Sequence, residues 1–147
     1  MYFALSLLCS YFITPPTLNL FLYIQITERP EDVKFFNPIV SQLIEKNLDI
    51  VFYDIDNHSE QFIIGYANKL LSESDKKIIF IDTELESNFS KLMSLLTNIL
   101  DNPEGIEIFA KGNNQKLEKM ISIFTYFKVS ETTHENKIIE RIINKFL

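Results

Sequence analysis

The sequence predicts an α/β protein of three layers, in which a five-stranded, mainly parallel sheet lies between two layers of helices. Five short apolar segments, rich in branched and aromatic residues, alternate with five segments whose apolar residues recur at helical spacing. The joins between these segments are short, and right-handed crossovers then make consecutive strands parallel and place helices on both faces of the sheet. The repeated β-then-α pattern is therefore what predicts the fold class.

The chain is long enough for one domain with its own hydrophobic core. It has 147 residues, 46% of them hydrophobic, and the 3 Gly and 5 Pro leave little room for linkers. Disordered chains are poor in aromatic residues, so the 13 Phe and 6 Tyr exclude that class. We expect a hydrophobic N-terminal arm at residues 1–17 and a single α/β domain at residues 18–147.

The first 27 residues carry no charged side chain. They lack the basic region and the small-residue cleavage site of a signal peptide. Pro15-Pro16 interrupts the apolar run after about 13 residues, whereas a transmembrane helix needs about 20. We expect a buried strand or helix, a Pro-Pro turn and then the first strand of the sheet. A dimer-forming arm and a peripheral membrane anchor are the alternatives, and the missing flanking charges count against the anchor.

The net charge of −6 argues against nucleic acid as a partner, because nucleic acid requires a basic face. The charge is unevenly spread along the chain. Residues 28–110 carry 16 acidic and 7 basic side chains, whereas residues 111–147 carry 4 acidic and 7 basic ones. This polarity could steer head-to-tail self-association, with an uneven spread of solvated charges as the alternative.

The single cysteine, Cys9, lies in an apolar run and cannot form an internal disulfide. A packed thiol in a reducing compartment is the expected state, which predicts a cytoplasmic protein. With one cysteine and two scattered histidines, the ligand spacing of a zinc site is absent. We therefore expect neither a metal nor a cofactor.

The first β-then-α unit begins with "LNLFLYIQI" at residues 18–26, a nearly continuous apolar run typical of a strand that is covered on both faces. Asn37 can cap the following helix, and Pro38 suits its first position. Residues 48–55, "LDIVFYDI", then form the second strand. The apolar stripe of the intervening helix consists of Ile39, Val40, Leu43 and Ile44.

Ser59 is expected to cap the second helix, which contains Gly65. Glycine inside a helix costs about 1 kcal/mol relative to alanine, so we expect close packing of this helix against the sheet. The third strand is predicted at residues 76–82, and its helix ends at Asn102-Pro103. The apolar positions of these two helices are Phe62, Ile63, Tyr66 and Leu70, and then Phe89, Leu92, Met93, Leu96, Ile99 and Leu100.

The last two strands are predicted at residues 105–112 and 125–130, and a helix with apolar positions from Leu117 to Phe124 separates them. Thr132 and Glu135 form a capping-box pattern before the final helix. That helix carries the apolar residues Ile138, Ile139, Ile142, Ile143 and Phe146. Five units of this kind suit the flavodoxin-like strand order 2-1-3-4-5, which we assume because the sequence does not specify the order.

Candidate ligand-binding residues follow the first three strands. In open parallel sheets, ligands bind beyond the carboxyl ends of the strands, where the strand order reverses, and in the assumed order that point lies between strands one and three. Turn formation and capping of the next helix are the alternative role for the acidic residues after the second strand. The candidates are Thr27 and Glu28 after strand one, Asp54 and Asp56 after strand two, and Asp82, Thr83 and Glu84 after strand three.

The sequence contains none of the common catalytic or phosphate-binding motifs. The first strand-to-helix join, "QITERPED", has no glycine, which counts against the usual dinucleotide and nucleoside-triphosphate sites. A G-x-S-x-G elbow and a serine, histidine and acid triad are also missing. We therefore expect no catalytic residues.

The order of features from "LFLYIQITERPED" through "LIEKNLDIVFYDIDNHSE" to "LLSESDKKIIFIDTELESNFSKLM" resembles a TIR domain over about two-thirds of the chain. TIR enzymes that cleave NAD carry a glutamate in a Trp-Cys-x-x-Glu-type segment after the third strand. Here "ELESNFSKLM" has neither Trp nor Cys, and Met93 stands near the position of that glutamate. The resemblance therefore implies a scaffold that associates with copies of itself.

Two further resemblances cover less of the chain. Asp82 and Lys128 are similar in position to the phosphoacceptor and the lysine of receiver domains, but Ala110 stands where that family has a hydroxyl. "FIIGYANKL" resembles the Glu-x-Gly-Tyr-Ala helix of nucleoside deoxyribosyltransferases, with Ile63 in place of the catalytic glutamate. In both cases, the resemblance lacks groups on which the family's chemistry depends.

We therefore predict a non-catalytic interaction or signalling module of the TIR-like or receiver-like kind, which acts by self-association or by docking a protein partner. The alternative is an enzyme or sensor for a small nucleotide-like ligand, such as NAD or a nucleoside. Its site would lie at the strand ends and use Glu28, Asp82 and Glu84.

Overall fold

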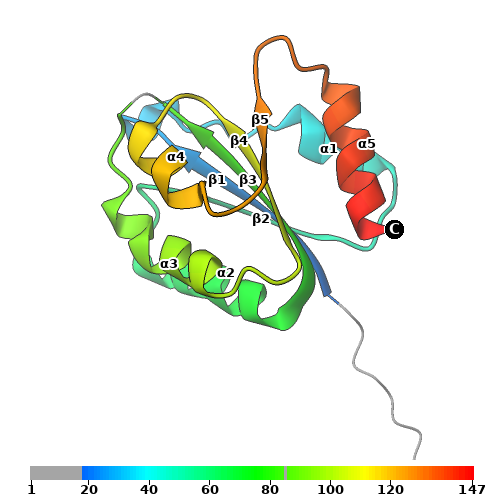
Figure 1. The fold of residues 1–147 in the computed structure, drawn as a ribbon, viewed down its shortest axis with the longest axis horizontal. Helices are drawn as coiled ribbons and strands as arrows, with labels where there is room; N and C mark the ends of the chain where they lie inside the picture. The colour runs from blue at the N-terminus through cyan, green and yellow to red at the C-terminus, as the bar shows by residue number, and fades with distance from the viewer. Residues whose placement is uncertain (1–17, 85) are drawn as a thin grey trace, which may run out of the picture.

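Five parallel strands form one sheet in the order β2-β1-β3-β4-β5 (Figure 1). The computed structural model describes residues 18–84 and 86–147, so the predicted arm at residues 1–17 lies outside the described residues. The strands are β1 (Leu18–Ile26), β2 (Val51–Asp56), β3 (Ser74–Thr83), β4 (Ile106–Lys111) and β5 (Tyr126–Val129). The predicted fold class and the assumed strand order are both confirmed.

Helices cover both faces of the sheet (Figure 1). They are α1 (Pro38–Glu45), α2 (Gln61–Glu73), α3 (Met93–Asp101), α4 (Gln115–Ile121) and α5 (Glu135–Phe146), with short 3-10 helices η1 (Pro30–Asp32) and η2 (Ser90–Leu92). The buried residues of α2, α3 and α4 pack on one face, and those of α1 and α5 pack on the other. None of the helices in the described part of the chain is long and apolar enough to cross a membrane.

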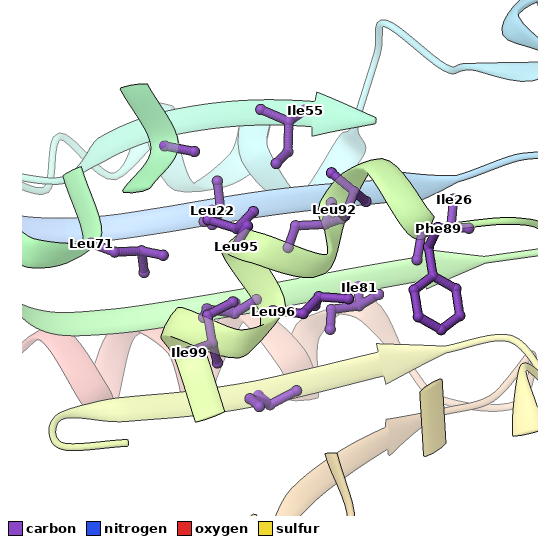
Figure 2. Close-up of a cluster of buried hydrophobic side chains, with 14 of the residues drawn as sticks. Leu22, Ile26, Ile55, Leu71, Ile81, Phe89, Leu92, Leu95, Leu96 and Ile99 are labelled. Carbon is purple, nitrogen blue, oxygen red and sulfur yellow. The ribbon is translucent and has the colours of Figure 1, made fainter. Parts of the chain in front are cut away.

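The core follows from the alternation of side chains along the strands. In β1, Leu20, Leu22, Ile24 and Ile26 point to the layer of α2, α3 and α4, whereas Phe21 and Tyr23 point to the layer of α1 and α5. Figure 2 shows residues of α3 lying over Leu22 and Ile81 of the two central strands. Because β1 and β3 are covered on both faces, their sequences read as continuous apolar runs, as predicted.

Two local predictions at the starts of elements have different outcomes. The Asn37 cap of α1 is confirmed, since its side-chain oxygen accepts hydrogen bonds from the backbone N–H groups of Ile39 and Val40. The start of the second strand at residue 48 is wrong, and β2 begins at Val51. Asn47 has a left-handed backbone with φ of 52°, and the Ile50 N–H donates to the Leu48 carbonyl, so the chain still turns there.

The two other predicted helix caps do not form. Ser59 instead accepts a hydrogen bond from the Asp56 N–H, and α2 follows Glu60. At the last helix, His134 occupies the capping position, and the Thr132 hydroxyl lies 2.9 Å from that of Ser130. Both hydroxyls are used to close the turn after a strand, which competes with capping.

The predicted close packing at Gly65 is wrong. This glycine is exposed, and a Cβ added to it would meet no other atom within 4 Å. The glycines that allow close approach are instead Gly105 and Gly112, which flank β4 and have φ of 70° and 96°. They lie against the backbone carbonyls of Asp75 and Thr83, respectively.

Candidate functional site

A polar cavity of about 550 Å³ lies at the carboxyl ends of β1 and β2. Between β1 and β3 the strand order reverses, which is where open parallel sheets bind ligands. Two of the candidate residues, Thr27 and Glu28, line this cavity. Its other lining residues are Asn57 and His58 after β2, and Glu86, Ser87, Asn88, Ser90 and Lys91 after β3.

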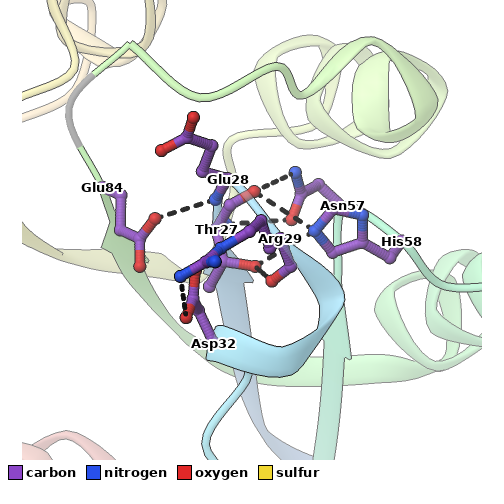
Figure 3. A network of polar contacts seen from close by, with 7 residues as sticks. All are labelled: Thr27, Glu28, Arg29, Asp32, Asn57, His58 and Glu84. Carbon is purple, nitrogen blue, oxygen red and sulfur yellow. Dashed lines mark hydrogen bonds and ion pairs between the residues drawn. The ribbon is translucent and has the colours of Figure 1, made fainter.

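Asn57 connects the three chain segments that form the cavity, and Figure 3 shows its contacts with Thr27. Its side-chain oxygen accepts from the Thr27 N–H at 2.9 Å, and its side-chain nitrogen donates to the carbonyls of Thr27 and Asn88, both at 2.8 Å. The backbone N–H of Asn57 also donates to the Gln25 carbonyl. This buried side chain therefore extends the β1–β2 pairing beyond the last strand residues and fixes the segment after β3.

Asn114 holds the same segment from the other side. It is buried at the start of α4, where its side-chain oxygen accepts from the Leu117 N–H. Its side-chain nitrogen donates to the carbonyl of Ser87, the residue before Asn88. Asn57 and Asn114, both buried, thus bind the carbonyl groups of two successive residues, Asn88 and Ser87. In the sequence, the signals for this wall of the cavity were the polar stretch "ESNFS" at residues 86–90 and the asparagines at positions 57 and 114. Each of these two asparagines lies about thirty residues along the chain from the carbonyl group that it binds in this stretch.

The hydrogen bonds around Thr27 assign a donor role to His58. The Thr27 hydroxyl donates to the Arg29 carbonyl at 2.9 Å. The Nε2 atom of His58 lies 3.1 Å from that hydroxyl oxygen and 3.2 Å from the Thr27 carbonyl oxygen. Both oxygens can accept, so all three contacts are satisfied when Nε2 carries a proton. In this arrangement His58 positions Thr27 and does not take up its proton, so Thr27 is not activated as a nucleophile.

Glu84 joins the site through the backbone. Its carboxylate accepts a hydrogen bond of 2.8 Å from the Glu28 N–H, while the Glu28 side chain is exposed (Figure 3). Arg29 forms a 3.3 Å ion pair with Asp32 of η1 and directs its charge into that turn. The structure thus brings Thr27, Glu28 and Glu84 together, as expected from their positions after β1 and β3.

The three candidate aspartates lie on the other face of the sheet. By alternation along β2 and β3, Asp54, Asp56 and Asp82 share the face that α1 and α5 cover. Asp82 accepts a 2.9 Å hydrogen bond from the Tyr23 hydroxyl. Burial, together with the nearby Asp82 carboxylate, raises the pKa of Tyr23 well above its ordinary value. Asp54 instead lines an apolar cavity between α1 and β2.

Asp56 and Thr83 have structural partners. The Asp56 carboxylate accepts from the His58 N–H at 2.7 Å and so closes the turn after β2. Thr83 is buried, and Gly112 packs so tightly against it that an added Cβ would lie 1.9 Å from the Thr83 carbonyl oxygen. Neither residue lines the polar cavity.

A second cavity, of about 830 Å³, lies on the far side of the segment after β3. It shares Glu86, Ser87, Asn88 and Ser90 with the polar cavity, and it adds apolar residues such as Met93. The Ser87 hydroxyl is buried and has no hydrogen-bond partner among the described residues. An unpaired buried hydroxyl is costly, and this one is covered by protein atoms and is not open to either cavity.

The described residues do not form the arrangement of groups that receiver domains use. Lys128 makes a 3.1 Å ion pair with Glu118 of α4, while Asp82 is bonded to Tyr23. Within residues 18–84 and 86–147, no group of three His, Cys, Asp or Glu side chains is placed to hold a metal ion. The side chains that line the polar cavity carry amides, hydroxyls, one imidazole, one amine and the carboxylates of Glu28 and Glu86.

The chain was compared with protein-family models, with curated protein sequences and with solved structures, and nothing matches. The function is therefore inferred from the geometry of the two faces and the edges of the sheet.

Proposed function

We propose that this chain is a non-catalytic interaction module that self-associates through the free edge of β2. The resemblance to TIR domains implies self-association, and the structure's exposed side chains suggest the edge. The observation that carries the proposal is a group of exposed apolar side chains on both sides of that edge. Five of the eight large apolar side chains that are exposed in the described part of the chain flank β2: Phe35, Phe36, Ile44, Phe62 and Tyr66. We call these five residues the β2-edge surface.

The edge of β2 is open for backbone pairing. Among the described strands, β2 pairs only with β1, so its outer side presents unpaired N–H and C=O groups. On one side of the edge, Phe35 is 94% exposed and Phe36 is 70% exposed. These two residues and Ile44 line a cavity of about 250 Å³ between α1 and β2.

On the other side of the edge, α2 presents Phe62 and Tyr66. Phe62 is 77% exposed, and the ring of Tyr66 packs 5.3 Å from that of Tyr53 in β2. The two residues are one helical turn apart and so share a face of α2. Exposed apolar side chains on both sides of an open edge strand are typical of a surface that binds an added strand.

The phenylalanines of the β2-edge surface follow a segment that is held in place. Buried Gln25 makes two hydrogen bonds of 2.8 Å to the backbone of Lys34, one to its carbonyl and one from its N–H. Phe35 and Phe36 follow directly and are presented to solvent next to this fixed point. A surface that is ordered in advance loses less conformational entropy on binding.

Light scattering over a range of protein concentrations tests the proposal. We expect the mass to rise above that of the 17.2 kDa chain in the wild type and in Ile123→Ser, and to stay lower in Phe62→Ser. Ile123 is 71% exposed and outside the β2-edge surface, so it is a matched control for Phe62. A wild-type protein that is a strict monomer at every concentration contradicts the proposal. The single cysteine supports placing the module in the reducing cytoplasm.

The polar lining of the 550 Å³ cavity, at the point where the strand order reverses, supports a second candidate function, the binding of a small polar molecule. A thermal-shift screen with nucleosides, nucleotides, NAD and Mg²⁺ tests it. Binding to the folded state raises the stability by about 2.7 kcal/mol when the ligand is a hundredfold above its Kd. The shift should disappear in Lys91→Ala and persist in Lys77→Ala, a lysine that does not line this cavity. No shift with any compound contradicts this second function.

A further inference from the structure

We infer that the partner of the β2-edge surface is the segment 2–13 of a second copy of this chain, added to the sheet as a strand beside β2. This inference rests on the proposed self-association and names the segment that mediates it. Residues 2–13, "YFALSLLCSYFI", lie outside the described residues, and the inference uses their sequence and the place where the described chain begins.

The chemistry of the segment suits a strand that is covered on both sides. It has no charged residue, and alternate positions would face opposite sides of the sheet. One set contains Phe3, Leu5, Leu7, Cys9, Tyr11 and Ile13, and the other contains Tyr2, Ala4, Leu8 and Phe12. The β2-edge surface offers apolar cover on each side, from Phe35, Phe36 and Ile44 on one and from Phe62 and Tyr66 on the other.

The segment is also long enough for the edge. Twelve residues in extended conformation span about 40 Å, and the six residues of β2 span about 20 Å. A strand made from part of the segment therefore pairs with the whole of β2, and the remaining residues can reach the side chains of α1 and α2.

Charge favours this segment over direct pairing of two β2 strands. Antiparallel pairing of β2 with the β2 of another copy about its centre would bring the two Asp54 carboxylates close together, and such like-charge pairs are destabilising. The uncharged segment brings no like charge to this edge. It can therefore satisfy the open backbone groups without electrostatic repulsion.

The connection to β1 favours a second copy over the same chain. The described chain begins at Leu18, next to the first residues of β2, and β1 runs parallel to β2. To lie beside its own β2, the segment would have to reverse direction within residues 14–17, "TPPT". These four residues would also have to pass the start of β2, which takes the chain about two strand spacings, or ~10 Å, away from β1 before it reverses. Reciprocal exchange between two copies needs no reversal and gives a closed dimer.

Cross-linking across two copies tests the inference with the full-length chain. Cys9 is the single cysteine of the chain, so wild-type protein is mixed with a tagged Cys9→Ser/Asp54→Cys variant and treated with a short bismaleimide. We expect a mixed dimer that carries the tag. The control partner is Cys9→Ser/Ile123→Cys, whose cysteine stands at an exposed position away from β2.

The outcomes separate exchange from its rivals. A mixed dimer with cysteine at position 54 but not at position 123 supports the inference. Equal cross-linking at both positions, or none, overturns it. A chain that carries both Cys9 and Asp54→Cys and cross-links only within itself also overturns it, because the segment then lies on its own edge.

Solution mass separates failure of the inference from failure of the proposed function. We expect Leu7→Asp to raise the dimer Kd about tenfold or more, as Phe62→Ser does, because both remove apolar contact at the same edge. If Phe62→Ser weakens association and Leu7→Asp does not, the proposed function stands and the inference is wrong. If the wild type is a strict monomer, both fail.

Discussion

The hydroxyl of Tyr23 in β1 donates a 2.9 Å hydrogen bond to the carboxylate of Asp82 in β3, and this pair lies beneath the layer of α1 and α5. The bond explains why Asp82, although it stands at the end of a central strand, does not line the polar cavity. It also couples the stability of the fold to pH, because burial and the Asp82 carboxylate raise the pKa of Tyr23.

The free energy of unfolding should fall as the pH rises above about 10. Tyr23 stays protonated in the folded state, whereas an unfolded tyrosine ionises near that pH, so its contribution is complete below pH 10 and is lost above it. Urea unfolding between pH 9 and 11 should show a fall of up to about 1.4 kcal/mol per pH unit from this group. Tyr23→Phe should remove this part of the slope, and Asp82→Asn should reduce it. A Tyr23→Phe variant with an unchanged slope contradicts the assignment.

Asn57→Ala should lower the free energy of unfolding by about 2 to 3 kcal/mol. The substitution removes three side-chain hydrogen bonds and leaves the Thr27 N–H and the carbonyls of Thr27 and Asn88 without these partners. Chemical denaturation measures the loss. Asn102→Ala is the matched control, because Asn102 is exposed and, among the residues that the structure describes, forms its hydrogen bonds with Asn98 one turn away. Equal losses in the two variants would show that Asn57 does not connect the three segments.

The same substitution at two glycines should have opposite effects. Gly65→Ala should stabilise the protein by about 1 kcal/mol, because Gly65 lies in the exposed interior of α2 and has space for a methyl group. Gly112→Ala should destabilise it by more than that gain, because its φ is 96° and the added Cβ would lie 1.9 Å from the Thr83 carbonyl oxygen. Thermal unfolding of both variants tests the pair. Destabilisation by Gly65→Ala would restore the idea that this helix needs a glycine.

Gln25→Leu should release the segment that carries Phe35 and Phe36. Leucine has a similar size but cannot form the two hydrogen bonds to the backbone of Lys34. We expect faster hydrogen exchange of the Lys34 amide and weaker self-association, while the secondary structure seen by circular dichroism is unchanged. Unaltered exchange at Lys34 would mean that Gln25 does not order the β2-edge surface.

The sequence alone predicted the elements because their signals are local. The continuous apolar runs of β1 and β3 reflect strands that are buried on both faces, and the Asn37-Pro38 pair marks a helix start. Alternation along a strand also contains information that the site prediction did not use. Asp82 and Thr83 are neighbours in sequence and must point to opposite faces, so they could not both serve one ligand site.

The position of the polar cavity at the reversal of strand order was predictable only once the strand order was assumed, since any sheet with this order has that crevice. Its walls were not predictable. Asn57 reaches Thr27 and Asn88, each about thirty residues away, and such partners depend on the docking of whole segments. In the sequence alone, Asn57 is indistinguishable from a turn residue.

Periodicity along the chain thus determined which residues are strands and helices, because burial on one or two faces imposes its pattern on each element separately. Tertiary structure decided which polar side chains meet and which apolar ones stay exposed, as Phe35, Phe36 and Phe62 do beside β2. The physical reason is that local pattern records whether a residue is buried, whereas the identity of its neighbours depends on how separate elements pack.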